Sequence, residues 1–125
     1  MIFDSDIIIW IERGNKKAAK LFEETAQRSI SLQTYLELLQ CGSNRIQQRR
    51  TKDFLRDFEV SILPLTENIG HRASIYIEQF GLSHGMRAGD AIIAATSVEN
   101  VISLCSSNQK HYRAIPELDF KVFRP

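Results

Sequence analysis

The sequence predicts an α/β protein whose central sheet is mainly parallel and is covered by helices on both faces. Short apolar runs with the length of buried strands alternate along the chain with longer segments of helical apolar spacing. No repeat, low-complexity tract or linker interrupts the 125 residues. We therefore expect one domain over residues 1–125, which is long enough for a single hydrophobic core.

The N-terminal part of the chain predicts two strands and the helix between them. Residues 1–4 form a short apolar run that ends on an acid, and the isoleucine-rich residues 7–11 continue it as a helix or an extended segment. Asn15 is a suitable cap for a helix over residues 16–28, which carries an apolar stripe. Residues 29–32 (Ser-Ile-Ser-Leu) then predict a second strand.

In the middle of the chain, threonines mark the expected helix starts. Thr34 is the candidate cap of a helix that runs to about Arg45, with Glu37 at the capping-box spacing. Thr51 is the expected cap of a further helix rich in phenylalanine. Residues 60–63 predict a strand that the following proline closes.

The C-terminal part continues the alternation of helices and strands. Thr66 or Asn68 begins a helix with one apolar face, and Gly81 and Gly85 predict a loop after it. Beyond that loop, the pattern predicts a helix over 88–98, a strand at 101–105, a turn or short helix over 108–115 and a last strand at 120–123.

The composition is that of an ordinary globular protein. Lys plus Arg total 16 and Asp plus Glu total 15, so the charge balance neither demands nor excludes a nucleic-acid partner. The two cysteines lack zinc-site spacing and are expected to be small buried apolar residues. An N-terminus with early acids is not a secretory signal, and no apolar run is long enough to span a membrane. We therefore expect a cytoplasmic protein.

Three acids stand inside or beside apolar runs: Asp4, Glu37 and Asp90. Burial of an ionised carboxylate is costly unless a cation or hydrogen bonds compensate its charge. Sites in parallel sheets form at the carboxyl ends of the strands, where Asp4 and the residues after the strand at 101–105 fall. A shared Mg²⁺ or Mn²⁺ ion would compensate all three acids and could activate a water for phosphodiester hydrolysis.

Each of these acids also has an ordinary local interpretation. Glu37 could pair back to the backbone at Thr34, Asp90 could be favoured by the dipole of the helix that it begins, and Asp4 could cap the segment that follows it. The residues by themselves leave both interpretations open.

Four blocks of sequence resemble PIN domains, in the order found in that family. They are Ile2-Phe3-Asp4-Ser5-Asp6-Ile7-Ile8-Ile9, Ser31 to Gly42 around Glu37, Asp90-Ala91-Ile92-Ile93-Ala94-Ala95-Thr96, and Leu104-Cys105-Ser106-Ser107-Asn108-Gln109-Lys110-His111-Tyr112. The resemblance extends over the whole chain. Its length and tail are most similar to the VapC-type toxins of bacterial toxin–antitoxin pairs.

This resemblance implies a PIN-like three-layer α/β/α fold and a Mg²⁺-dependent (or Mn²⁺-dependent) endoribonuclease that inhibits translation. Asp4, Glu37 and Asp90 stand at the positions of the family's metal ligands, and Ser106 and Asn108 stand where the family has residues that orient them or the attacking water. The resemblance also implies an RNA substrate, a cognate VapB-like antitoxin and a homodimer.

The chain departs from the family pattern at one position. Many family members carry a fourth acid three residues after the asparagine, and this chain has His111 there. The number of bound metal ions, one or two, is therefore open. Asp6 is expected to cap the first helix or to support the ligands, and not to bind the metal itself.

Other features allow a functional and an ordinary interpretation. The basic cluster, formed by Arg45, Arg49, Arg50, Lys52 and Arg56, is expected to be a solvated face, although it could also bind phosphates or an acidic partner. Lys110 and Arg113 are better placed for substrate. Residues 8–11 could contribute to a partner groove, but a core role is favoured for most of them.

Two other functions remain as alternatives. The Asp4-Ser5-Asp6 triplet resembles the start of haloacid-dehalogenase-like phosphatases, although the chain is short for that fold. His111 in place of an acid is compatible with a PIN-like module that binds RNA or protein and has little or no catalytic activity.

Overall fold

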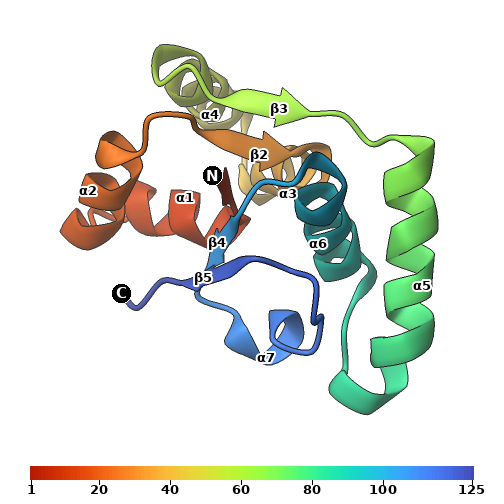
Figure 1. Ribbon diagram of the computed structural model, residues 1–125. Coiled ribbons are helices and arrows are strands. Elements are labelled where there is room, and N and C mark those ends of the chain that lie inside the picture. Colours follow the sequence, from red (N-terminus) through yellow and green to blue (C-terminus); the bar gives the residue numbers. More distant parts are fainter.

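The computed structural model describes residues 1–125 and contains one five-stranded sheet with the order β3-β2-β1-β4-β5 (Figure 1). The strands are β1 (Ile2–Phe3), β2 (Ser29–Ser31), β3 (Ser61–Leu63), β4 (Leu104–Ser106) and β5 (Phe120–Val122). The helices are α1 (Ser5–Glu12), α2 (Lys16–Glu24), α3 (Leu32–Cys41), α4 (Arg45–Asp57), α5 (Glu67–His84), α6 (Ala88–Asn100) and α7 (Gln109–Tyr112). All four strand pairs are parallel, which confirms the predicted fold class.

Alternation along the two central strands divides the core between the faces of the sheet. Ile2 of β1 and Leu104 of β4 point to one face, where they pack with side chains of α5 and α6. Phe3 and Cys105, the next residues, point to the other face and pack with α1, α2 and α4. Successive side chains of a strand point to opposite faces, so two helical layers enclose the sheet in a three-layer arrangement (Figure 1).

Two predicted helix starts were wrong because a competing cap lies earlier in the chain. Ser31, not Thr34, caps α3, and its hydroxyl accepts a hydrogen bond from the Thr34 backbone N–H at 3.0 Å. Asn44 caps α4 by the same kind of bond, so Thr51 lies in the middle of that helix and is buried. The helix predicted over 16–28 ends at Glu24.

The predicted loop at Gly81 and the predicted start of the strand at Val101 were also wrong. Helix α5, capped by Thr66, passes through Gly81 and ends only at Gly85, whose φ of 66° gives the left-handed cap that glycine favours. Val101 is the left-handed cap of α6, and it is almost fully exposed. The strand therefore begins at Leu104, where the chain re-enters the sheet beside β1.

The two cysteines differ in environment. Cys105 is buried in the sheet, as expected, but Cys41 ends α3 and is exposed, which corrects the expectation that both are buried. We expect one equivalent of thiol to react rapidly with an aromatic disulfide reagent in the native protein and two after denaturation. A C41S variant should lose the rapid equivalent, whereas rapid reaction of both thiols in the folded protein would contradict this packing.

None of the helices combines the length with the apolar composition that a membrane-spanning helix needs.

Candidate functional site

The candidate site lies where the two central strands end side by side. β1 and β4 pair through Phe3 and Cys105, and the Asp4 backbone N–H donates to the Cys105 carbonyl at 3.0 Å. From β1 the chain moves outward through β2 and β3, then crosses to the opposite side of β1 to form β4. This reversal is the switch point at which open parallel sheets place their sites.

Asp4 is held in this crevice by four hydrogen-bond donors. Its Oδ1 accepts from the backbone N–H of Ser5 at 2.7 Å, which caps α1, and from the Ser5 hydroxyl at 3.4 Å. Its Oδ2 accepts from the hydroxyls of Ser106 at 2.8 Å and Tyr112 at 3.1 Å. The residue is only 6% exposed, and this burial, with the nearby charge of Asp6, raises the pKa of Asp4 to about 6.

Asp6 binds the loop that follows β4. Its Oδ2 accepts from the backbone N–H of Ser107 at 2.9 Å and from the Ser107 hydroxyl, while the Ser106 hydroxyl lies 3.4 Å away. Its Oδ1 is buried and has no hydrogen-bond partner. Ser107 was not among the expected site residues, because a serine in a loop carries no signal of a contact across about a hundred residues.

Glu37 projects from α3, and a hydrogen bond from Gln33, one turn earlier, partly offsets the rise in its pKa. The capping box with Thr34 does not form, because Ser31 caps this helix. Glu37 Oε1 is buried without a hydrogen bond. Burial is the main cause that raises the pKa of Glu37 to about 7, and the charges of Asp4 and Asp90 raise it further.

Asp90 lies in the first turn of α6, where it caps the helix and also contacts His111. Its Oδ2 accepts from the Arg87 backbone N–H at 3.4 Å, as a capping residue does. The same oxygen lies 2.6 Å from Nδ1 of His111. Both side chains are about four-fifths buried, so this contact is shielded from water.

Ser106 and Asn108 connect these acids to the C-terminal segment. The Ser106 hydroxyl is fully buried, donates to Asp4 and accepts from the backbone N–H of Asn108 at 3.0 Å. The Asn108 side-chain amide does not reach an acid directly; its Nδ2 lies 3.1 Å from Nδ1 of His111. Tyr112, which sequence reasoning did not select, completes the set through its bond to Asp4.

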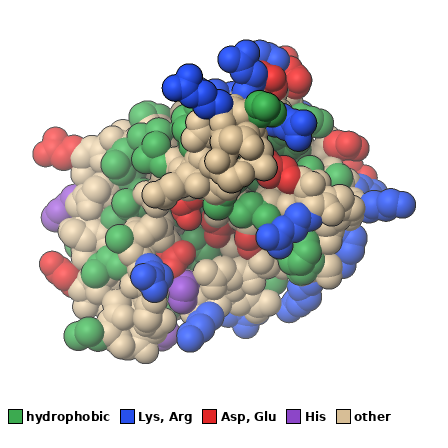
Figure 2. Space-filling view, turned by 180° about the vertical axis from the view of Figure 1, so that it is seen from behind, with side chains coloured by type: hydrophobic (Ala, Val, Ile, Leu, Met, Phe, Trp, Pro, Cys, Tyr) green, Lys and Arg blue, Asp and Glu red, His purple; other side chains and the backbone are tan.

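No Lys or Arg side chain balances the charge of this cluster. None of the Lys or Arg ion pairs in the structure involves Asp4, Asp6, Glu37 or Asp90, although the charges of the other three all act on Glu37. Figure 2 shows acidic side chains gathered in a recess in the middle of one face, with basic side chains around it. Uncompensated carboxylates in a recess favour a bound cation.

The oxygen-rich donor set suits Mg²⁺ or Mn²⁺, and the unpaired Oε1 of Glu37 is free to coordinate. No three of the acid, histidine and cysteine side chains, however, lie in the arrangement of a preformed metal site. Ligation would therefore require movements of these side chains.

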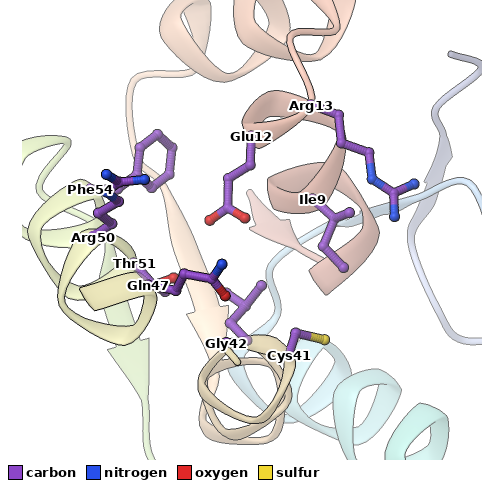
Figure 3. Close-up of a pocket in the computed structure, with 10 residues that line it drawn as sticks. Ile9, Glu12, Arg13, Cys41, Gly42, Gln47, Arg50, Thr51 and Phe54 are labelled. Atoms are coloured by element: carbon purple, nitrogen blue, oxygen red, sulfur yellow. The ribbon is translucent and has the colours of Figure 1, made fainter. Parts of the chain in front are cut away.

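A separate pocket of about 840 Å³ opens between α1, α3 and α4 (Figure 3). Glu12 points into it from α1, while Ile9, Leu38 and Phe54 supply apolar surface. Burial raises the pKa of Glu12 above its ordinary value. Of the residues at 8–11 that were considered for a partner groove, Ile9 lines this pocket, whereas Ile8 is fully buried in the core.

The basic cluster is divided between two faces of α4. Arg50 lines the pocket between α1, α3 and α4, whereas Arg45, Arg49, Lys52 and Arg56 lie together on an exposed face. Arg56 forms exposed ion pairs with Asp53 and Asp57. This second face is the solvated surface that such a run of charges ordinarily forms.

Comparisons with known proteins give one family. The model of the PIN domain family matches residues 1–117. A chain of a toxin–antitoxin complex from Klebsiella pneumoniae is similar in structure, with a TM-score of 0.79 and 25% sequence identity over 94% of this chain and 93% of that chain.

Two further structures share the fold at lower identity. They are VapBC-1 from nontypeable Haemophilus influenzae (TM-score 0.79, 22% identity, 98% of each chain) and VapBC2 from Rickettsia felis bound to a DNA fragment from its promoter (TM-score 0.77, 20% identity, 99% of this chain and 100% of that chain). None of the curated proteins matches this chain in sequence.

Proposed function

Because the chain belongs to the PIN domain family, we propose that it is a VapC-like endoribonuclease toxin that hydrolyses RNA phosphodiester bonds with the help of a divalent metal ion. The observation that carries this proposal is the acidic recess: four carboxyl groups gather where the central strands end, and no Lys or Arg is paired with them. This family assignment also replaces the haloacid-dehalogenase-like alternative.

Asp4, Glu37 and Asp90 are the proposed ligands of one Mg²⁺ or Mn²⁺ ion. When bound, the ion supplies a nucleophilic water near neutral pH and stabilises the charge that develops on the phosphate. Ser106 holds the Asp4 carboxylate by its hydroxyl, and Asp6 holds the loop that carries Ser106 and Ser107. Lys110 of α7 and Arg113, which follows this helix as its C-cap, are exposed and are the proposed contacts for RNA phosphates.

Chelation is the first test of the proposal. The purified protein is expected to cleave RNA in Mg²⁺ or Mn²⁺, to lose cleavage in excess EDTA and to recover it when metal is restored, measured on labelled oligonucleotides and on total cellular RNA. A common contaminating ribonuclease that needs no metal would continue to cleave in EDTA. A folded protein that binds RNA but cuts none of these substrates with metal present would instead support the binding-module alternative.

We also propose a cognate antitoxin of the VapB type as the partner, on the basis of the solved toxin–antitoxin complexes with the same fold. The pocket between α1, α3 and α4 offers the partner an apolar floor next to the helix that carries Glu37. A small protein encoded beside this gene is expected to co-purify with the chain and to inhibit cleavage. An I9E variant should weaken that complex, since Ile9 lines the pocket, but should leave the cleavage of RNA by the free protein intact.

A further inference from the structure

The short helix α7 contacts two of the site acids through adjacent residues. The Tyr112 hydroxyl donates to Asp4 Oδ2 at 3.1 Å, and Nδ1 of His111 lies 2.6 Å from Asp90 Oδ2. Asp4 follows β1 and Asp90 begins α6, so these acids come from elements far apart in the sequence. One turn of helix near the C-terminus thus contacts both of them.

Tyr112 is suited to a fixed contact. Its side chain is fully buried, and its ring packs on that of Phe120 at a centroid distance of 5.5 Å, so the hydroxyl has little freedom to leave Asp4. A carboxylate is an acceptor, so the Tyr112 hydroxyl is the donor in this contact.

His111 makes the corresponding contact with Asp90. A carboxylate is an acceptor, so the short Nδ1 to Oδ2 distance places the Nδ1 proton between the two side chains. Asn108 Nδ2 lies 3.1 Å from the same nitrogen, but an amide N–H cannot bond to Nδ1 when Nδ1 itself donates to Asp90. The histidine thus occupies one oxygen of Asp90 as a donor.

We propose that His111 and Tyr112 are positioning residues, which hold the Asp90 and Asp4 carboxylates in a fixed orientation by hydrogen bonds. The inference rests on the proposed metal site of Asp4 and Asp90. In this arrangement α7 orients the ligands. His111, which stands where a fourth acid was expected, is a hydrogen-bond donor to Asp90. Donors of this kind fix the orientation of a metal-binding carboxylate.

The test is a calorimetric titration of the full chain with Mn²⁺, combined with kcat and KM for RNA cleavage. Y112F removes only a hydroxyl, and H111L removes the nitrogen next to Asp90. Each is expected to weaken Mn²⁺ binding by at least about tenfold, the effect typical of losing a hydrogen-bond partner of a ligand. The kcat should fall while the KM for RNA stays unchanged. H111N, whose side-chain amide can place an N–H near the Nδ1 position, should restore most of the affinity.

Two matched variants separate a positioning role from a general loss of stability. Y76F removes another buried tyrosine hydroxyl, which donates to Glu117 at 2.6 Å outside the site, and H71L changes an exposed histidine. Both are expected to bind Mn²⁺ as the wild type does. Circular dichroism and thermal melts check folding.

The outcomes distinguish the two proposals. If D4N and D90N lose Mn²⁺ binding while Y112F and H111L bind it like the wild type, the positioning role is wrong and the metal site stands. If D4N and D90N also bind Mn²⁺ like the wild type, the metal site itself is wrong. A loss in H111L that H111N does not restore would overturn the role of the Nδ1 contact.

Discussion

Replacement of Asp4 or Asp90 with asparagine is expected to lower metal-dependent RNA cleavage by more than about 100-fold, because even a partner of a metal ligand contributes about 10–100-fold. Asparagine keeps the size of the side chain and can still cap a helix, so Asp4→Asn should preserve the start of α1. It lacks the negative charge that binds the cation. The measurement is the initial cleavage rate of a labelled RNA at saturating Mg²⁺.

Asp57→Asn is the matched control for this experiment. Asp57 is an exposed acid at the end of α4 and forms an ion pair with Arg56 at 3.2 Å. Exposed pairs of this kind contribute little to stability. The control should cleave RNA at the wild-type rate, and wild-type rates in correctly folded Asp4→Asn and Asp90→Asn variants would show that the site has been assigned to the wrong residues.

The free energy of unfolding of the metal-free protein is expected to fall as the pH rises from about 4 to 7. The folded-state pKa of Asp4, about 6, and that of Glu37, about 7, lie above their ordinary values of 3.8 and 4.5. The unfolded chain therefore releases these protons at lower pH than the folded protein does, so the stabilisation present below pH 4 is lost as both groups ionise in the fold. For Asp4 the loss is about 3 kcal/mol.

Glu37→Gln isolates one part of this effect. The variant removes a charge that Asp4 and Asp90 repel, and we expect it to raise the melting temperature of the metal-free protein at pH 7.5 by about 4 °C, which corresponds to about 1 kcal/mol after allowance for solvent screening. At pH 4, where wild-type Glu37 is already protonated, the two proteins should melt together. Saturating Mn²⁺ should stabilise the wild type and have little effect on the variant.

The control is Glu23→Gln, which changes an exposed acid on α2. It should change the melting temperature little at either pH and leave the response to Mn²⁺ intact. A Glu37→Gln variant that is less stable than the wild type at pH 7.5 would mean that a favourable partner already compensates Glu37 in the metal-free protein.

The sequence by itself determined the order of strands and helices and the location of the site edge. Apolar runs and helical spacing are local properties, and they were sufficient to predict a parallel sheet with Asp4 directly after its first strand. Boundaries were less certain where two local signals competed. Asn44 and Thr51 are both good caps, and the helix begins after the earlier one, with Thr51 buried in its middle.

Only the tertiary structure decided how each acid is held. Asp6 bonds to Ser107, Asp4 to Tyr112 and Asp90 to His111, and none of these pairs is close in sequence. Such contacts depend on how β1, β4 and α6 pack, because a side chain's partners across the sheet leave no periodic trace in the chain. The residue pattern therefore placed Asp4 at this edge and left open whether Glu37 and Asp90 converge on it, whereas the fold determined which carboxylate oxygens accept hydrogen bonds and which, such as Oε1 of Glu37, have no partner.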